Sequence, residues 1–126
     1  MDTKITLVYA CGFYSLGFAI FHIAFWKLFD WKNDLKKLKL ANRAIIQIAN
    51  LRLIYIFLGV SFVCFYLPVD LISTSLGRIF MIGMSGFWLG RTIEQFIFLN
   101  VSHWMVNLLT LLFLLGVLLF SLPVIL

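Results

Sequence analysis

The chain has 126 residues, of which 63% are hydrophobic, 17% aromatic and only 12% charged, and its formal net charge is +5. This balance lies far outside that of soluble globular domains, so a soluble enzyme or binding module is excluded. The basic residues gather beside predicted membrane boundaries, which favours contact with membrane lipids and argues against nucleic acid as a partner.

Four apolar stretches follow one another along the chain, at about residues 5–29, 36–67, 72–99 and 103–125. Each is long enough to cross the hydrocarbon layer of a bilayer, which takes a helix of about 20 residues. The sequence therefore predicts an all-α integral membrane protein, with a single transmembrane domain over residues 1–126 that folds as a four-helix bundle.

The first stretch carries small residues and an imidazole on one helical face. They recur at spacings of three, four and three: Gly12, Ser15, Ala19 and His22. Small residues let helices approach closely, so we expect this face, His22 included, to lie inside the bundle. The stretch ends in aromatic and basic residues between Phe25 and Lys32, a mixture typical of a membrane interface.

The connection after the first stretch holds most of the basic residues: Lys27, Lys32, Lys36, Lys37, Lys39 and Arg43. The connection near Pro68 carries only Asp70 and Arg78. Because basic loops stay in the cytoplasm, this asymmetry predicts a bacterial-type inner-membrane protein with both termini outside. The lysines are interpreted as anchors at the membrane interface.

Each of the other three stretches also has a polar or small stripe. The second carries Arg43, Gln47 and Asn50, the third carries Gly83, Gly86, Gly90 and Glu94, and the fourth carries Asn100, His103, Asn107 and Thr110. We expect the glycine seam of the third stretch to face the bundle interior, or a second copy in a homo-oligomer, with Arg91 pairing with Glu94. Ser102 is expected to cap the fourth helix.

The simplest prediction is that the polar faces of the four helices meet inside the bundle. An unpaired polar group in hydrocarbon costs several kcal/mol, and such a meeting would give each group a partner. We predict one pocket toward the cytoplasm that binds a small polar or anionic ligand or a lipid headgroup, including a ligand to be transported. The expected roles are charge recognition by Arg43 and Arg91, acid/base or proton-linked chemistry by Glu94, His103 and His22, and orientation of the ligand by Gln47, Asn50 and Asn107.

Other functions fit the same residues. His22 and His103 could be the axial ligands of a b-type haem, or could bind a metal ion together with Glu94. Glu94 or a histidine could also serve as acid or base in an enzyme acting on a lipid or isoprenoid-like substrate. A hydrogen-bonded network that only fixes helix register is the structural alternative. No motif names a cofactor.

The two cysteines, Cys11 and Cys64, both fall in the outer halves of their predicted helices. A thiol pair or disulfide between them is one interpretation. Packing as two small apolar residues is the other, and the absence of a C-x-x-C motif favours it.

Overall fold

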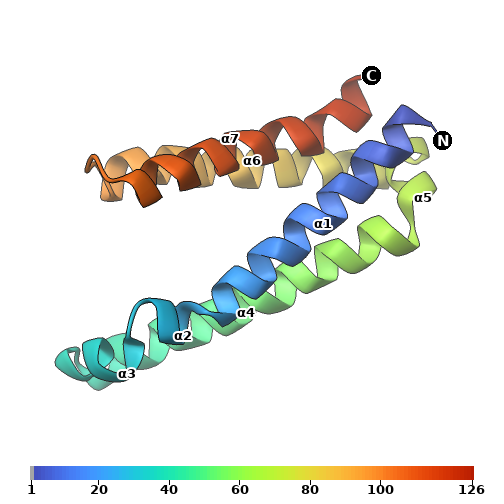
Figure 1. Ribbon diagram of the computed structural model, residues 1–126. Helices are drawn as coiled ribbons and strands as arrows, with labels where there is room; N and C mark the ends of the chain where they lie inside the picture. Colours follow the sequence, from blue (N-terminus) through green and yellow to red (C-terminus); the bar gives the residue numbers. More distant parts are fainter. Residues whose placement is uncertain (1) are drawn as a thin grey trace. The chain divides into compact units, whose positions relative to one another are not determined.

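The computed structural model describes residues 2–126, and every regular element within them is helical (Figure 1). The prediction of an all-α chain is therefore confirmed. The chain divides into two compact units, one formed by Gly12–Val63 and the other by Met1–Cys11 together with Cys64–Leu126.

Most of two long helices and the helical connection between them make up the first unit, Gly12–Val63. The elements are α1 (Thr3–Ile23), α2 (Phe25–Leu28), α3 (Trp31–Asp34), the 3-10 helix η1 (Leu35–Lys37) and α4 (Leu40–Tyr66). Within this unit the long helices are joined by two hydrogen bonds. Ser61 Oγ donates to the carbonyl of Gly12 at 2.9 Å, and Asn50 Nδ2 donates to the carbonyl of His22 at 2.8 Å.

The small-residue face of α1 is buried, as predicted. Gly12 is buried, Ser15 and Ala19 are 0% exposed, and His22 is half-buried. The hydrogen bonds to Gly12 and His22 lie on this same face. Close approach of the backbone of α1 is what lets the side chains of α4 reach its carbonyl groups.

The connection between α1 and α4 contains more helix than the sequence predicted. The first helix was expected to reach residue 29 and the second to begin at residue 36, but α1 ends at Ile23 and α4 begins at Leu40. Asp30 adopts the left-handed conformation, with φ 51° and ψ 47°, between α2 and α3. Aspartate tolerates this conformation, which breaks a right-handed helix and turns the chain.

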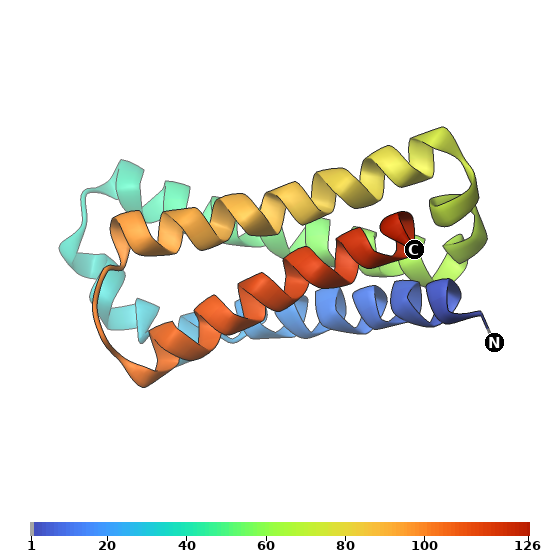
Figure 2. The same ribbon diagram turned by 90° about the horizontal axis from the view of Figure 1, so that it is seen from above.

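The second unit contains α5 (Pro68–Ser73), α6 (Ser75–Phe98) and α7 (Trp104–Ile125). Helices α6 and α7 run side by side in opposite directions (Figure 2). Ser85 Oγ donates to the carbonyl of Val117 at 2.8 Å, and the rings of Trp88 and Phe113 stack with centroids 5.6 Å apart. Met81 on α6 and Phe120 on α7 are also fully buried.

The start of α6 is fixed by a cap and by a close backbone contact. Thr74 is the N-cap, and its Oγ1 accepts a hydrogen bond from the Gly77 amide at 2.9 Å, a role for which threonine is well suited. Gly77 is buried against α5, where a Cβ atom would collide with the carbonyl oxygen of Asp70 and with the backbone of Leu71. A glycine is therefore required at this position.

Three helices in the described part of the chain are long and apolar enough to cross a membrane: α1, α4 and α7. Helix α6, at 24 residues, is long enough for the span predicted at residues 72–99, but Arg78, Arg91, Glu94 and several glycines lower its apolar content. The structure thus supports a membrane protein, while the fourth span and the four-helix bundle stay predictions.

Candidate functional site

The predicted site residues fall in both units of the chain. His22, Arg43, Gln47 and Asn50 belong to Gly12–Val63, and Arg91, Glu94, His103 and Asn107 belong to the other unit. Convergence of the polar stripes on one pocket accordingly stays a prediction. Each unit nevertheless has a cavity of its own that some of these residues line.

A cavity of about 220 Å³ lies between the helical connection and the first turns of α4. We call it the basic pocket, and its lining is Trp26, Trp31, Lys32, Leu35, Lys36, Arg43 and Gln47. Arg43 and Gln47 were predicted as ligand-binding residues. The lysines and tryptophans were interpreted only as interfacial anchors, because their arrangement around a cavity depends on the short helices α2, α3 and η1.

One wall of the basic pocket is held by a hydrogen bond between α2 and α4 and by a second one within α4. Trp26 Nε1 donates to Gln47 Oε1 at 3.0 Å, and Gln47 Nε2 donates to the carbonyl of Arg43 at 3.1 Å. Trp31 meets Trp26 edge-on, with ring centroids 5.2 Å apart. The amide of Gln47 thus orients the indole of Trp26, and the two indoles form a preformed aromatic wall.

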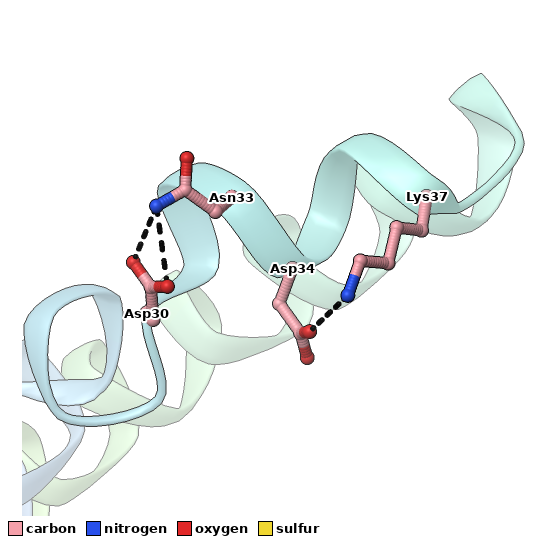
Figure 3. A network of polar contacts seen from close by, with 4 residues as sticks. All are labelled: Asp30, Asn33, Asp34 and Lys37. Carbon is pink, nitrogen blue, oxygen red and sulfur yellow. Dashed lines mark hydrogen bonds and ion pairs between the residues drawn. The ribbon is translucent and has the colours of Figure 1, made fainter.

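The acidic residues of the same connection interact with other partners (Figure 3). Asn33 Nδ2 donates to both carboxylate oxygens of Asp30, at 3.1 and 3.2 Å. Asp34 forms an ion pair with Lys37, with 3.6 Å between Oδ1 and Nζ. The ion pair partly compensates the charge of Lys37, which does not line the basic pocket.

Three cations of the basic pocket therefore lack a compensating charge. Lys32, Lys36 and Arg43 line it, no carboxylate does, and none of the three forms an ion pair within residues 2–126. Cations that share a partly enclosed space repel one another, and an anion placed between them relieves this repulsion. The electrostatics of the basic pocket consequently favour an anionic ligand.

His22 lies in a cluster of aromatic rings at the end of α1. Its ring stacks on Phe25 at a centroid distance of 4.3 Å and lies 5.1 Å from the ring of Phe57. Its Nδ1 is 2.8 Å from the carbonyl oxygen of Phe18, and because a carbonyl only accepts, Nδ1 carries the hydrogen. Proteins orient metal-ligating histidines through the same kind of bond, so the haem and metal hypotheses for His22 stay open.

Asn50 makes the bond that links α4 to the last turn of α1, and it is 4% exposed. Replacing Asn50 by leucine removes the donor to the His22 carbonyl and is expected to destabilise the protein by about 1 kcal/mol. Thermal unfolding in detergent measures this change. Asn42→Leu, at an exposed position of the same helix, is the control and should have little effect. Equal stability of the two variants would contradict a structural role for Asn50.

The glycines Gly83, Gly86 and Gly90 of α6 do not face α7, so their predicted contact with the bundle interior or with a second copy stays a prediction. Gly83, Gly86 and Glu94 are exposed, and a Cβ atom built on Gly83, Gly86 or Gly90 would have no neighbour within 4 Å. The buried face of α6 is instead Gly77, Met81, Met84, Ser85, Trp88, Thr92 and Gln95. Trp88 and Ser85 on this face contact Phe113 and Val117 of α7.

Arg91 and Glu94 lie one turn apart on α6 and interact electrostatically, but they form no direct ion pair within residues 2–126. The guanidinium of half-buried Arg91 lies over the ring of Phe113, 4.7 Å from its centroid, in a cation–π contact. Glu94, its expected partner, is exposed. Arg91 therefore packs along α7, and the proton-linked role of Glu94 stays a prediction.

His103 caps α7, a role that was expected of Ser102. Its Nδ1 accepts a hydrogen bond from the amide of Met105 at 3.2 Å, and its side chain is exposed. The hydrogen of the neutral ring must then lie on Nε2. If Nε2 bound a haem or metal ion, the hydrogen of the ring would move to Nδ1. Nδ1 could then no longer accept from the Met105 amide, and the cap of α7 would be lost. Asn107 lines a second cavity, at the connection between α6 and α7.

The two cysteines are free and fully buried, at 0% exposed each. Cys11 Sγ donates to the carbonyl of Leu119 at 3.0 Å within their common unit. This environment agrees with the interpretation of small packing residues. Within residues 2–126, no three His, Cys, Asp or Glu side chains form a group that could hold a metal ion.

Comparison of the chain with protein families, with curated proteins and with solved structures found no match.

Proposed function

We propose that this chain is a four-span inner-membrane protein with both termini outside, which binds the anionic headgroup of a membrane amphiphile in the basic pocket. The observation that carries the proposal is the charge of one cavity. Lys32, Lys36 and Arg43 line it together with two tryptophans and without a carboxylate.

The residue types suit a phosphate-bearing headgroup. A guanidinium such as that of Arg43 donates two parallel hydrogen bonds to a phosphate, and lysine ammonium groups add positive charge. Tryptophans prefer the depth of the headgroups, and basic pockets on the cytoplasmic side of membrane proteins bind anionic headgroups. Trp26 is already oriented by Gln47, so little ordering is needed when a headgroup binds.

The size of the basic pocket favours binding of a lipid headgroup over enclosure of an entire drug-sized molecule. Its volume of about 220 Å³ is smaller than the roughly 300–1,000 Å³ of pockets that enclose a drug-sized molecule. The acyl chains would stay in the bilayer. Apolar residues are available to them on the outer surface of α4, where Leu40, Ile45 and Ile48 are 70%, 61% and 57% exposed.

Removing the pocket's charge should abolish headgroup selectivity. The triple variant Lys32→Gln, Lys36→Gln, Arg43→Gln is expected to weaken binding of short-chain phosphatidylglycerol about 100-fold, because each cation near a membrane surface contributes about 1 kcal/mol. Native mass spectrometry of the detergent-solubilised protein measures the bound fraction. Phosphatidylcholine tests selectivity, and inorganic phosphate tests whether a free anion competes.

A matched triple variant separates a built site from general surface charge. Lys27→Gln, Lys37→Gln, Lys39→Gln removes the same charge from the same connection, but none of these residues lines the basic pocket. It should retain most of the binding. Equal losses in the two triple variants, or equal binding of both lipids by the native chain, would refute the proposal.

A further inference from the structure

The second unit contains a cavity of different chemistry, which the proposed function does not use. It has a volume of about 210 Å³ and lies where α6 turns into α7. We call it the amide cavity, and its lining is Gln95, Phe96, Leu99, Asn100, Val101, Ser102, Val106, Asn107 and Thr110. No charged side chain lines it. Its polar side chains are three amides and two hydroxyls.

Gln95 lines this cavity and carries a buried acceptor without a partner. The residue is 1% exposed, and its Nε2 donates to the carbonyl of Val106 at 3.3 Å. Since a carbonyl only accepts, this contact fixes the NH₂ group on the side of Val106 and turns Oε1 the other way. Oε1 is buried and has no hydrogen-bond partner. Buried acceptors are rarely left in this state, so each needs an explanation.

The hydroxyl of Thr110 is a second group that can only accept a hydrogen bond from a ligand. Its Oγ1 donates its hydrogen to the same Val106 carbonyl at 2.9 Å. The remaining lone pairs of Oγ1 can then only accept. A ligand that meets both Gln95 Oε1 and Thr110 Oγ1 must therefore supply hydrogen-bond donors.

We infer that the amide cavity binds an uncharged hydroxylated group, of the kind found in glycerol and in sugars. A hydroxyl donates to Gln95 Oε1 and Thr110 Oγ1 and also accepts from the amides of Asn100 and Asn107. A phosphate or carboxylate only accepts, so it would repel the two fixed acceptors. An ammonium group would be buried without the carboxylate that its charge requires. Phe96 offers an apolar contact for the ring or carbon face of such a group.

Gln95→Leu is the decisive variant, because leucine has a similar size and cannot accept. Its affinity for a short-chain monoglucosyl diacylglycerol should fall about tenfold or more. The thermal midpoint without ligand should stay the same or rise, because an unsatisfied buried acceptor is removed. Thr110→Val should weaken binding in the same direction. Native mass spectrometry and thermal unfolding in detergent provide the two readouts.

Thr92→Val is the matched control. Thr92 is 4% exposed, lies on the same helix face as Gln95 and donates to the Trp88 carbonyl at 2.8 Å, but does not line the cavity. It should bind the glycolipid as the native chain does. Free glucose in a parallel titration distinguishes a soluble polyol from a lipid headgroup. Failure of the native chain to bind either probe, or unchanged binding in both Gln95→Leu and Thr110→Val, would overturn the inference and leave water as the cavity's occupant.

Discussion

Gly77→Ala should destabilise the protein by about 2 kcal/mol, the middle of the range for adding a methyl group to a filled interior. In an open helix position the same change would stabilise, because alanine has the higher helix propensity. At Gly77 the added Cβ would collide with backbone atoms of Asp70 and Leu71. Backbone atoms cannot rotate away as a flexible side chain can, so α5 must move or α6 must shift. Thermal unfolding in detergent gives the change in stability.

The same helix offers controls for this prediction. Gly83 and Gly86 have open space where a Cβ would lie, so alanine at either position should be neutral or stabilise by up to about 1 kcal/mol. Gly77→Ala as stable as these variants would show that α5 does not pack on α6 as described. The controls also report on the predicted homo-oligomer, because a second copy seated on the glycine seam would dissociate when Gly83 and Gly86 are enlarged.

The inward face of α1 could be predicted because only one face of that helix is suited to close contact. Gly12, Ser15 and Ala19 share one side of the helix, and larger residues such as Phe13 and Ile20, 67% and 60% exposed, cover other sides. Spacing alone separates these faces. Gln47 and Asn50 were placed correctly on the contact side of α4 for the same reason.

The face of α6 that packs on α7 could not be predicted from its glycines, because this helix has two candidate contact faces. One carries Gly83, Gly86 and Gly90, and the other carries Met81 and Trp88. Small residues permit close approach, but the large residues offer more contact area to a neighbour such as Phe113. The spacing of residues in the sequence does not show which of the two faces packs on the neighbouring helix. The glycine face also favoured Glu94 over Gln95, which is the next residue but points about 100° away around the helix.

The two cavities were not predictable from periodicity. Both lie where helices end, and their shapes depend on turns rather than on a repeating face. The basic pocket exists because Asp30 takes a left-handed conformation and the chain folds into α3 and η1 before α4 begins. Residues that a hydropathy pattern assigns to an interface, such as Lys32 and Lys36, thereby become the lining of a cavity.

Cysteine labelling should place both chain ends outside the cell, because α6 is expected to cross the membrane despite its polar residues. Its 24 residues give a helix of about 36 Å, against a hydrocarbon layer of about 30 Å. It also lies along α7, an apolar candidate span, with contacts from Ser85 to Gln95. A helix that packs along a membrane span shares its depth, and the ring of Phe113 shields the charge of Arg91.

Four single substitutions decide between four spans and three: Asp2→Cys, Lys39→Cys, Val101→Cys and Leu126→Cys. A membrane-impermeant thiol reagent applied to intact cells should label the first and last of them, and the middle two only after the membrane is opened. The native chain measures the background, which should be low because Cys11 and Cys64 are 0% exposed. If only α1, α4 and α7 crossed the membrane, Val101→Cys would be labelled in intact cells and Leu126→Cys protected. Asp2→Cys and Lys39→Cys keep the same labelling in both topologies, so they calibrate the assay while the other pair reports on α6 alone.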